Sequence, residues 1–265
     1  MSRMFDRMDR EEIAVGTIML APGREYVEVI GYAGLDFVCL DMMVTPLDWS
    51  EAASMVTSAA LHGVTPWLRL SAYPWANEEF DASLSAQVLR GLSIGAECVL
   101  ASVNTAREVE AMLHPLSNPH RRYYLARGAG RTDDQERFDA AEAPQQVIPI
   151  IESEGALNNV DEILAVDGVR YVYLGMGDLT RALGHPGDDR HPEVRDAVAS
   201  IVAKARDRGI RVCANMLANV PGIDISEQIV ASIQALRELG VSAAMTPRPT
   251  MVLQRFYEAT LRQVR

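Results

Sequence analysis

Eight short apolar runs recur along the chain, and this repetition limits the possible folds more than any other feature of the sequence. The runs are rich in Val, Ile and Leu, and segments with apolar residues at helical spacing separate them. This alternation is typical of parallel strands that helices cover. Eight is the number of strands that closes a (β/α)₈ barrel. The predicted strands are residues 14–19, 37–41, 66–70, 98–102, 147–152, 171–175, 210–215 and 243–246.

The segments between the runs complete the pattern. Several end in a glycine, which suits a helix C-terminus that needs a left-handed residue before the next strand. The predicted helices are residues 25–33, 50–62, 83–95, 105–113, 156–166, 192–209 and 226–240, with a last helix from Thr250, and the glycines are Gly63, Gly95, Gly209 and Gly240. The chain of 265 residues has the length of one such barrel. We therefore predict an α/β protein, a single (β/α)₈ TIM barrel over residues 1–265. A flavodoxin-like sheet, which uses fewer strands, is the structural alternative.

Composition and charge exclude several classes of protein. Apolar residues make up 48% of the chain, enough for a large core, and the formal net charge is −11. Such a charge repels nucleic acid and anionic membranes, so we expect neither as a partner. No apolar run is long enough to cross a bilayer, and the charged N-terminus lacks the apolar stretch of a signal peptide. Cys39, Cys98 and Cys213 lie in apolar runs without the spacing of a metal site. We expect a cytoplasmic protein with buried thiols and a small-molecule ligand.

One connection breaks the regular rhythm. Between Ser102 and Val147, a short helix is followed by a polar stretch that carries several arginines and an acidic run from Asp133. Long connections in compact domains are usually functional or mobile. Residues 123–126 could form a ninth short strand, but we interpret them as part of this loop and the acidic run as a solvated segment.

Charged residues stand at or just after the ends of four predicted strands. They are Asp41, Arg69, Glu152 and Asp178. Active sites of (β/α)₈ barrels lie at the C-terminal ends of the strands, so these side chains should meet at one mouth. Three carboxylates without a nearby thiolate or histidine cluster favour a hard cation, Mg²⁺ or Mn²⁺. Each charge taken alone also fits a solvated strand end, and Asp178 also fits the N-cap of a following helix.

The five histidines offer little chemistry by their positions. His62 and His114 fall at helix ends, and His120 lies in the long connection. His185 and His191 flank the turn-rich segment GHPGDDRHPE. We interpret each of them as a surface residue rather than a catalyst.

Several segments resemble the HpcH/HpaI aldolases, the 4-hydroxy-2-oxoheptanedioate aldolase group of the class II pyruvate aldolases. The longest is PIIESEGALNNVDEILAVDGVRYVYLGMGDLT at residues 149–180, which contains Glu152 and Asp178. The others are GLDFVCLDMM at 34–43, WLRL at 67–70, GAECVLASVNTAREVE at 95–110 and HPEV at 191–194. The resemblance spans nearly the whole chain and implies a barrel of the phosphoenolpyruvate/pyruvate type.

The resemblance implies a divalent-metal-dependent carbon-carbon lyase that acts on a 2-oxo acid. Glu152 and Asp178 would hold Mg²⁺ or Mn²⁺, and Gly177 and Asp178 would contact the substrate, which chelates the metal and forms a pyruvate enolate. Arg69 matches the arginine that holds the keto oxygen and its developing charge, and Asp41 matches an acidic residue near the site with a catalytic role. The family's usual assembly implies a homo-oligomer, a hexamer or trimer of dimers.

The chain departs from the family pattern at the residues of the acid-base step. Met43 and Val44 stand where the family has a Glu-His pair, and Ser93 stands where it has the aspartate that partners this histidine. Ile150 replaces a glutamine two positions before Glu152. By this comparison metal and enolate binding are retained, while the acid-base dyad of aldol cleavage is removed.

These departures leave several functions open. The chain could be a lyase with a relocated base or an oxaloacetate-type decarboxylase, because loss of CO₂ needs no such base. It could be a biosynthetic enzyme that diverts the enolate to another electrophile, and the apolar side chains of Met42, Met43 and Val44 would suit a less polar one. It could also be a degenerate relative that binds a 2-oxo acid without turnover.

Overall fold

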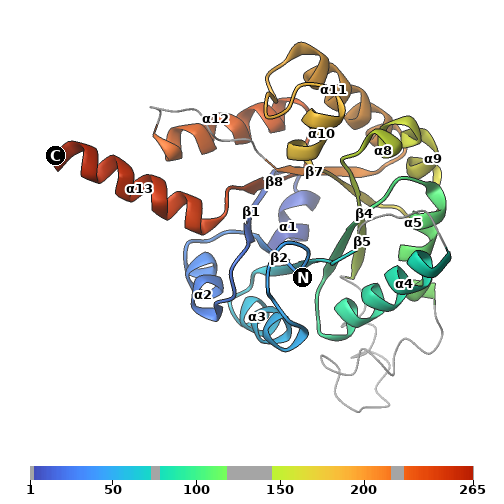
Figure 1. Cartoon of the computed structure of the whole chain (residues 1–265), viewed down its shortest axis with the longest axis horizontal. Coiled ribbons are helices and arrows are strands. Elements are labelled where there is room, and N and C mark those ends of the chain that lie inside the picture. Colours follow the sequence, from blue (N-terminus) through green and yellow to red (C-terminus); the bar gives the residue numbers. More distant parts are fainter. Residues whose placement is uncertain (1–2, 73–77, 118–144, 216–223, 265) are drawn as a thin grey trace.

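In the computed structural model, which describes residues 3–72, 78–117, 145–215 and 224–264, eight parallel strands close into a barrel (Figure 1). Each strand pairs with its neighbours in sequence, and β8 pairs with β1. The closed barrel excludes the flavodoxin-like alternative. All eight predicted strands are confirmed, with every end within one residue. They are β1 (Ala14–Met19), β2 (Phe37–Asp41), β3 (Thr65–Arg69), β4 (Cys98–Ser102), β5 (Gln146–Ile151), β6 (Tyr171–Leu174), β7 (Arg211–Asn215) and β8 (Ala243–Thr246).

Helices surround the barrel and connect successive strands (Figure 1). The four glycines predicted to end helices all have positive φ, from 67° to 99°, which confirms their role before the next strand. The helices that were predicted are α2 (Arg24–Tyr32), α3 (Trp49–Leu61), α4 (Glu78–Ser93), α5 (Ala106–Leu113), α11 (Pro192–Asp207), α12 (Ile225–Glu238) and α13 (Pro249–Val264).

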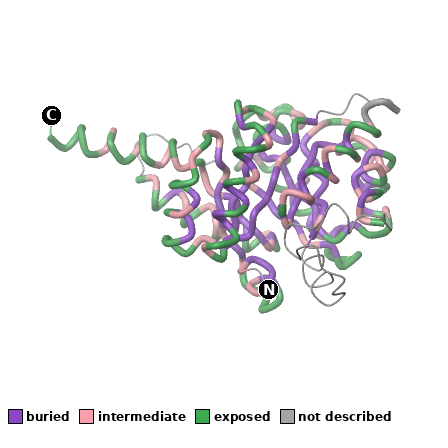
Figure 2. The backbone as a smooth tube through the Cα atoms, turned by 90° about the horizontal axis from the view of Figure 1, so that it is seen from below, coloured by how far each residue is buried: buried purple, intermediate pink, exposed green. Residues whose placement is uncertain are grey.

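The strands are buried at the centre of the molecule (Figure 2). Their side chains form two apolar layers, one on each face of the closed sheet. Outward-facing side chains pack against the helices. Inward-facing side chains fill the barrel, where the rings of Phe37 and Trp67 stack at 4.2 Å and Tyr173 meets Trp67 edge-on at 6.5 Å between centroids. Cys39, Cys98 and Cys213 are buried and free, as predicted. The barrel is therefore a packed core and not a pore.

The N-terminal segment forms a helix that the sequence did not predict. Apolar side chains of α1 (Arg3–Asp9) are buried in the cluster that fills the barrel. The indole Nε1 of Trp67 donates a hydrogen bond to Met4 Sδ at 3.2 Å, and Arg7 Nε lies 2.7 Å from Oδ1 of Asp36, which precedes β2. Seven residues are too few for a convincing helical period, so this segment looked only like a charged terminus. It closes the N-terminal end of the barrel and leaves the opposite end as the mouth.

The helix predicted for residues 156–166 is two short helices instead. They are α8 (Glu154–Asn158) and α9 (Val160–Ala165), and they meet at Asn159, whose φ of −108° and ψ of 16° leave the helical region. The Asn159 side chain donates Nδ2 to the carbonyl of Asn104 at 2.8 Å. A side-chain amide that bonds to backbone elsewhere competes with helix continuation, which explains the break.

One further helix begins earlier than predicted, and two predictions fall on residues that the structure does not describe. Helix α4 starts at Glu78, five residues before the predicted start at Ser83. Residues 123–126 and the acidic run from Asp133 lie outside the described residues. Within the described ranges, no helix is both long and apolar enough to cross a membrane.

The last helix leaves the barrel. α13 begins beside α12 and β1 and then projects away from the rest of the chain (Figures 1 and 2). None of its described residues is buried. Its large exposed apolar side chains are separated by three or four residues, apart from one adjacent pair, and so lie on one face of the helix. They are Leu253, Phe256, Tyr257, Leu261 and Val264.

Candidate active site

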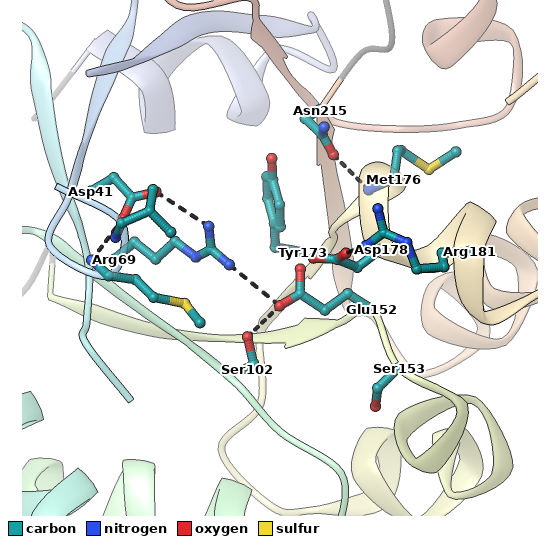
Figure 3. A network of polar contacts seen from close by, with 12 residues as sticks. Asp41, Arg69, Ser102, Glu152, Ser153, Tyr173, Met176, Asp178, Arg181 and Asn215 are labelled. Carbon is teal, nitrogen blue, oxygen red and sulfur yellow. Dashed lines mark hydrogen bonds and ion pairs between the residues drawn. The ribbon is translucent and has the colours of Figure 1, made fainter. Parts of the chain in front are cut away.

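Three of the four charged residues predicted from the strand ends touch one another at the mouth (Figure 3). Arg69 ends β3, and its Nη1 lies 3.2 Å from Oδ2 of Asp41, its register partner on β2. Its Nη2 lies 3.4 Å from Oε1 of Glu152, which follows β5. The guanidinium therefore bridges carboxylates from two strands that are not neighbours in the barrel.

Asp41 is fully buried and uses both carboxylate oxygens inside the protein. Oδ1 accepts hydrogen bonds from the amides of Met43 at 2.7 Å and Val44 at 3.2 Å, and Oδ2 faces Arg69. Asp41 thus fixes the turn after β2 and the orientation of Arg69 at once. It does not line the cavity described below, so its predicted catalytic role would be exerted through Arg69.

Glu152 is 8% exposed, and its two oxygens have different surroundings. Oε1 accepts hydrogen bonds from Ser102 Oγ and from Arg69. Oε2 lies against Gly175, where an added Cβ would approach it to 2.1 Å. Only glycine allows this closeness, so Gly175 lets the carboxylate of Glu152 occupy its position beside the start of α10.

The surroundings of Glu152 favour its neutral form. Burial raises the pKa of Glu152 above its ordinary value, and the charges of Asp178 and Asp41 add to the rise, against the opposing effects of Arg69 and Ser102. Two buried carboxylates, Asp41 and Glu152, face a single guanidinium. The site is short of positive charge, which is the electrostatic condition that a bound cation would correct.

Arg69 remains charged although it is largely buried. Burial alone would lower its pKa, but the carboxylates of Glu152 and Asp41 outweigh burial and raise the pKa of the guanidinium. Its buried Nε has no hydrogen-bond partner within the described chain. A buried donor without a partner costs free energy, so the position of Arg69 is fixed by its two carboxylate partners and not by full satisfaction of its own donors.

Asp178 lies in the first turn of α10 (Met176–Ala182), as its third residue. The alternative that Asp178 is the N-cap is therefore wrong: Gly175 holds that position without a side-chain cap, and Asn215 Oδ1 accepts from the amide of Met176 at 2.6 Å. The carboxylate of Asp178 is half exposed and pairs with Arg181 on the same helix. An exposed pair of this kind contributes little, so a cation can compete for Asp178.

Arg69, Glu152 and Asp178 line one cavity of about 210 Å³ at the mouth. Gly177 also lines it, and a Cβ there would meet nothing within 4 Å, so its face is open. The floor is mostly apolar and includes Ile18, Leu100, Ile150 and Met245. A cavity of this size suits a small acid rather than a nucleotide.

The donor set of this cavity fits a hard divalent cation. The Oε2 atom of Glu152 and the carboxylate of Asp178 are oxygen ligands, and a small octahedral cation such as Mg²⁺ is commonly held by one or two carboxylates with water and substrate oxygens. The predicted ligands Glu152 and Asp178 therefore lie where such an ion could be bound.

Comparison with known proteins identifies the family. A model of the HpcH/HpaI aldolase/citrate lyase family matches residues 24–249, most of the chain. The chain belongs to the HpcH/HpaI aldolase/citrate lyase family. Class II aldolases of this family generally depend on a divalent metal.

Several similar proteins are aldolases. A hydroxypyruvate/pyruvate aldolase of Rhizorhabdus wittichii is 31% identical over 202 residues, 72% of this chain and 74% of that protein. A 2-keto-3-deoxy-L-rhamnonate aldolase of Escherichia coli is 27% identical over 235 residues, 85% of this chain and 82% of that protein. The crystal structure of an HpcH/HpaI aldolase from Desulfitobacterium hafniense superposes with a TM-score of 0.80 at 22% identity, covering 100% of this chain and 97% of that one. These relatives support an aldolase-like lyase activity.

The positions at which the family dyad is expected lie far apart in this chain. Val44 is on the rim of the mouth and 64% exposed. Ser93 is the last residue of α4, which runs toward the start of β4 at the opposite end of the barrel, and its Oγ donates to the carbonyl of Arg90 at 2.8 Å. One chain does not bring these positions together, so a pairing of Val44 with Ser93 would require a second copy.

The structure adds three polar residues that the sequence did not single out. Ser102 ends β4 and Asn215 ends β7, so the strand-end rule that found Glu152 would have found both. Tyr173 faces into the barrel from β6 and lines the cavity, donating its hydroxyl to Met245 Sδ at 3.4 Å. Burial raises the pKa of Tyr173, so its phenol stays protonated.

We expect Glu152→Gln to leave the metal-free protein at least as stable as wild type at pH 7 to 8. The folded-state pKa of Glu152 is raised, so stability linked to its protonation is present at low pH and is lost as pH rises through that pKa. The wild type should therefore lose free energy of unfolding as pH rises above about 4.5, the ordinary value of a glutamate, and the Gln variant should not. Urea denaturation across this pH range in the presence of EDTA measures it. A clear loss of stability in the variant at pH 8 would contradict this reading of the site.

Proposed function

We propose that this protein is a divalent-metal-dependent carbon-carbon lyase that acts on a 2-oxo acid at the mouth of the barrel. One observation carries the proposal: Glu152 has one oxygen held by Arg69 and Ser102 and the other free against Gly175, in the cavity that Asp178 also lines. The membership of the aldolase/citrate lyase family supports the reaction class.

Glu152 and Asp178 would hold Mg²⁺ or Mn²⁺. When bound, the ion would polarise the 2-oxo acid and stabilise the negative charge that develops on its oxygen. Arg69, which also lines the cavity, would add a fixed cation beside the same oxygen. The open face of Gly177 would admit the substrate, and the apolar floor would exclude water from the reacting carbon.

The side of the mouth near the turn after β2 would receive the second reactant. Met42 is buried and Val44 is exposed there, and Asp41 holds the turn in place. Neither side chain can take a proton, so a step that needs a general base from this turn should be slow. Decarboxylation, in which the bond to the departing carboxylate breaks and CO₂ leaves, needs no such base. It should therefore be faster than aldol cleavage.

We also infer that the protein is a homo-oligomer and that α13 contributes to the contact. The apolar stripe of α13 projects into solvent, and exposed stripes of this kind usually mark protein interfaces. Helix α2, which follows β1, exposes Val29 and Tyr32, and Leu61 is exposed at the end of α3. In a two-fold symmetric dimer, α13 of each copy could cover the exposed residues of α2 and α3 on the other copy, because such a contact uses the same surfaces on each chain.

The test of the proposed function is metal-dependent release of pyruvate from 4-hydroxy-2-oxo acids and from oxaloacetate. Wild type should be active with Mg²⁺ or Mn²⁺, and Glu152→Ala and Asp178→Ala should lose activity while they keep the fold. Glu154→Ala is the matched control, because Glu154 is an exposed acid two residues from Glu152. Equal metal affinity of Glu152→Ala and wild type by titration would show that the ligand assignment is wrong.

Arg69→Lys should act on the rate more than on binding. It keeps the charge but loses the fork that spans Asp41 and Glu152. We expect kcat to fall by about a hundredfold or more, as for loss of an oxyanion donor, with a smaller change in KM. Arg107→Lys, in an ion pair with Asp81 away from the cavity, is the control. A normal kcat in Arg69→Lys would remove Arg69 from the mechanism.

Wild type should decarboxylate oxaloacetate but cleave simple 4-hydroxy-2-oxo acids slowly. Val44→His would supply a base at the rim, and general-base catalysis is worth about 10² to 10⁴ in rate. The measurement is retro-aldol kcat/KM for wild type and variant, with decarboxylation as the internal control. Within one chain, Ser93 lies at the opposite end of the barrel from Val44. Ser93→Asp should therefore add to the gain only when copies of the chain associate. Fast wild-type cleavage that Val44→His does not raise would show that another residue is the base.

Phe256→Asp should weaken self-association, because it places a charge in the apolar stripe of α13. The same charge on the other face of the helix, in Ala259→Asp, should leave assembly unchanged. Light scattering coupled to size-exclusion chromatography reports the mass of each. A monomeric wild type would contradict the inference, as would equal effects of the two substitutions.

A further inference from the structure

A second group of possible metal ligands lies outside the active-site cavity, in the connection between α10 and α11. His185 follows α10, His191 is the N-cap of α11, and Glu193 is in its first turn. Their ligand atoms all lie within 4.8 Å of one another. The sequence predicted two unremarkable surface histidines here, and the structure brings them together.

The three side chains are already in contact. The imidazole rings of His185 and His191 stack with 3.5 Å between centroids and 16° between planes. Nε2 of His185 lies 2.7 Å from Oε2 of Glu193. The amide of Glu193 donates to Nδ1 of His191 at 3.3 Å, so the Nδ1 lone pair already points toward this residue.

The backbone holds this cluster in place at little entropic cost. The His185 amide donates to the carbonyl of Thr180 at 2.8 Å, and the Gly187 amide donates to Thr180 Oγ1 at 3.0 Å, which ties the connection to α10. Each histidine precedes a proline, and proline fixes its own φ and restricts the residue before it. The ligands are therefore largely positioned before any ion binds.

The donor set differs in chemistry from that of the active site. Two imidazole nitrogens and one carboxylate suit Zn²⁺ and similar borderline cations, which bind such His₂Glu sets with water as a fourth ligand. Mg²⁺ prefers oxygen ligands and should bind poorly here. The two sites should thus select different ions.

Binding would require a small rearrangement. The nitrogen lone pairs of two stacked rings lie in nearly parallel planes and cannot both point at one ion. One imidazole ring must therefore rotate about χ2 before both histidines can bind the same ion. An ion on Nδ1 of His191 would also replace the long hydrogen bond from the Glu193 amide, which is one bond at the start of α11.

We propose that His185, His191 and Glu193 form a second metal site, selective for Zn²⁺-like cations, that clamps the end of α10 to the start of α11. Asp178 lies in the first turn of α10, so an ion at the clamp would restrain the helix that carries one candidate ligand of the active site. The clamp itself makes no contact with substrate.

The test uses untagged, chelator-treated protein carrying Glu152→Ala and Asp178→Ala, which removes the active-site ligands. Isothermal titration should show that one equivalent of Zn²⁺ binds, and thermal denaturation should show that Zn²⁺ raises the melting temperature. Mg²⁺ should give no comparable response in either measurement. Co²⁺ should give a visible absorption band typical of nitrogen and oxygen ligation. These readouts do not depend on activity, so they stand whether or not the lyase function is correct.

In the same background, His185→Gln and His191→Asn should each weaken Zn²⁺ binding by at least about tenfold, which is what loss of even an outer-shell partner of a metal site can cost. Asn at 191 keeps an N-cap residue, so α11 should still form. His114→Gln, at a histidine that belongs to no group of possible metal ligands among the described residues, should change nothing. Zn²⁺ affinity unaffected by both cluster variants, absence of stoichiometric binding, or equal binding of Mg²⁺ would overturn the proposal.

Discussion

The candidate site depends on one buried cation. Arg69 joins a carboxylate on β2 to one that follows β5, and the pKa of its guanidinium is raised because those carboxylates outweigh the cost of burial. Removing Arg69 would leave two buried carboxylates without their shared cation, which costs far more than the pairing itself stabilises. The positions of Asp41 and Glu152 are therefore linked through Arg69, and the turn that Asp41 holds is linked with them.

The same cluster remains one positive charge short, and this deficit gives the mouth its chemistry. Glu152 is buried with a raised pKa, and its Oε2 atom packs against Gly175 and takes no part in the contacts with Arg69 and Ser102. A divalent cation at this point would relieve the repulsion between Glu152 and the nearby charges of Asp178 and Asp41. The electrostatic strain of the protein alone thus points to the kind of ligand that would stabilise it, in agreement with the metal dependence general to class II aldolases of the family.

The rest of the barrel confines this chemistry to one end. The helix α1 and the stacked rings of Phe37 and Trp67 fill the N-terminal end with apolar contacts. Helix α10 starts at the opposite end, where Asn215 from β7 caps its first amide and Asp178 reaches the cavity. Its last residues lead into the histidine cluster, so a single short helix connects two sites whose donor atoms suit different ions.

The sequence by itself determined the elements and the identity of the strand-end charges. Strand and helix patterns are local, because burial follows a period set by the backbone geometry of each element, and so eight strands were placed within one residue. A helix of seven residues such as α1, or a break at a side chain such as Asn159, carries too little local signal to be found this way. Residues 123–126 fall outside the described residues, so their assignment to the long loop stays a prediction.

Only the tertiary structure decided which side chains meet. The bridge from Asp41 through Arg69 to Glu152 exists because the barrel closes in one register, and no local pattern encodes the distance across it. The packing of Glu152 on Gly175, the separation of Val44 from Ser93, and the stacking of His185 on His191 are likewise contacts between different elements. A sequence specifies what each element presents, while register and barrel closure determine what it faces.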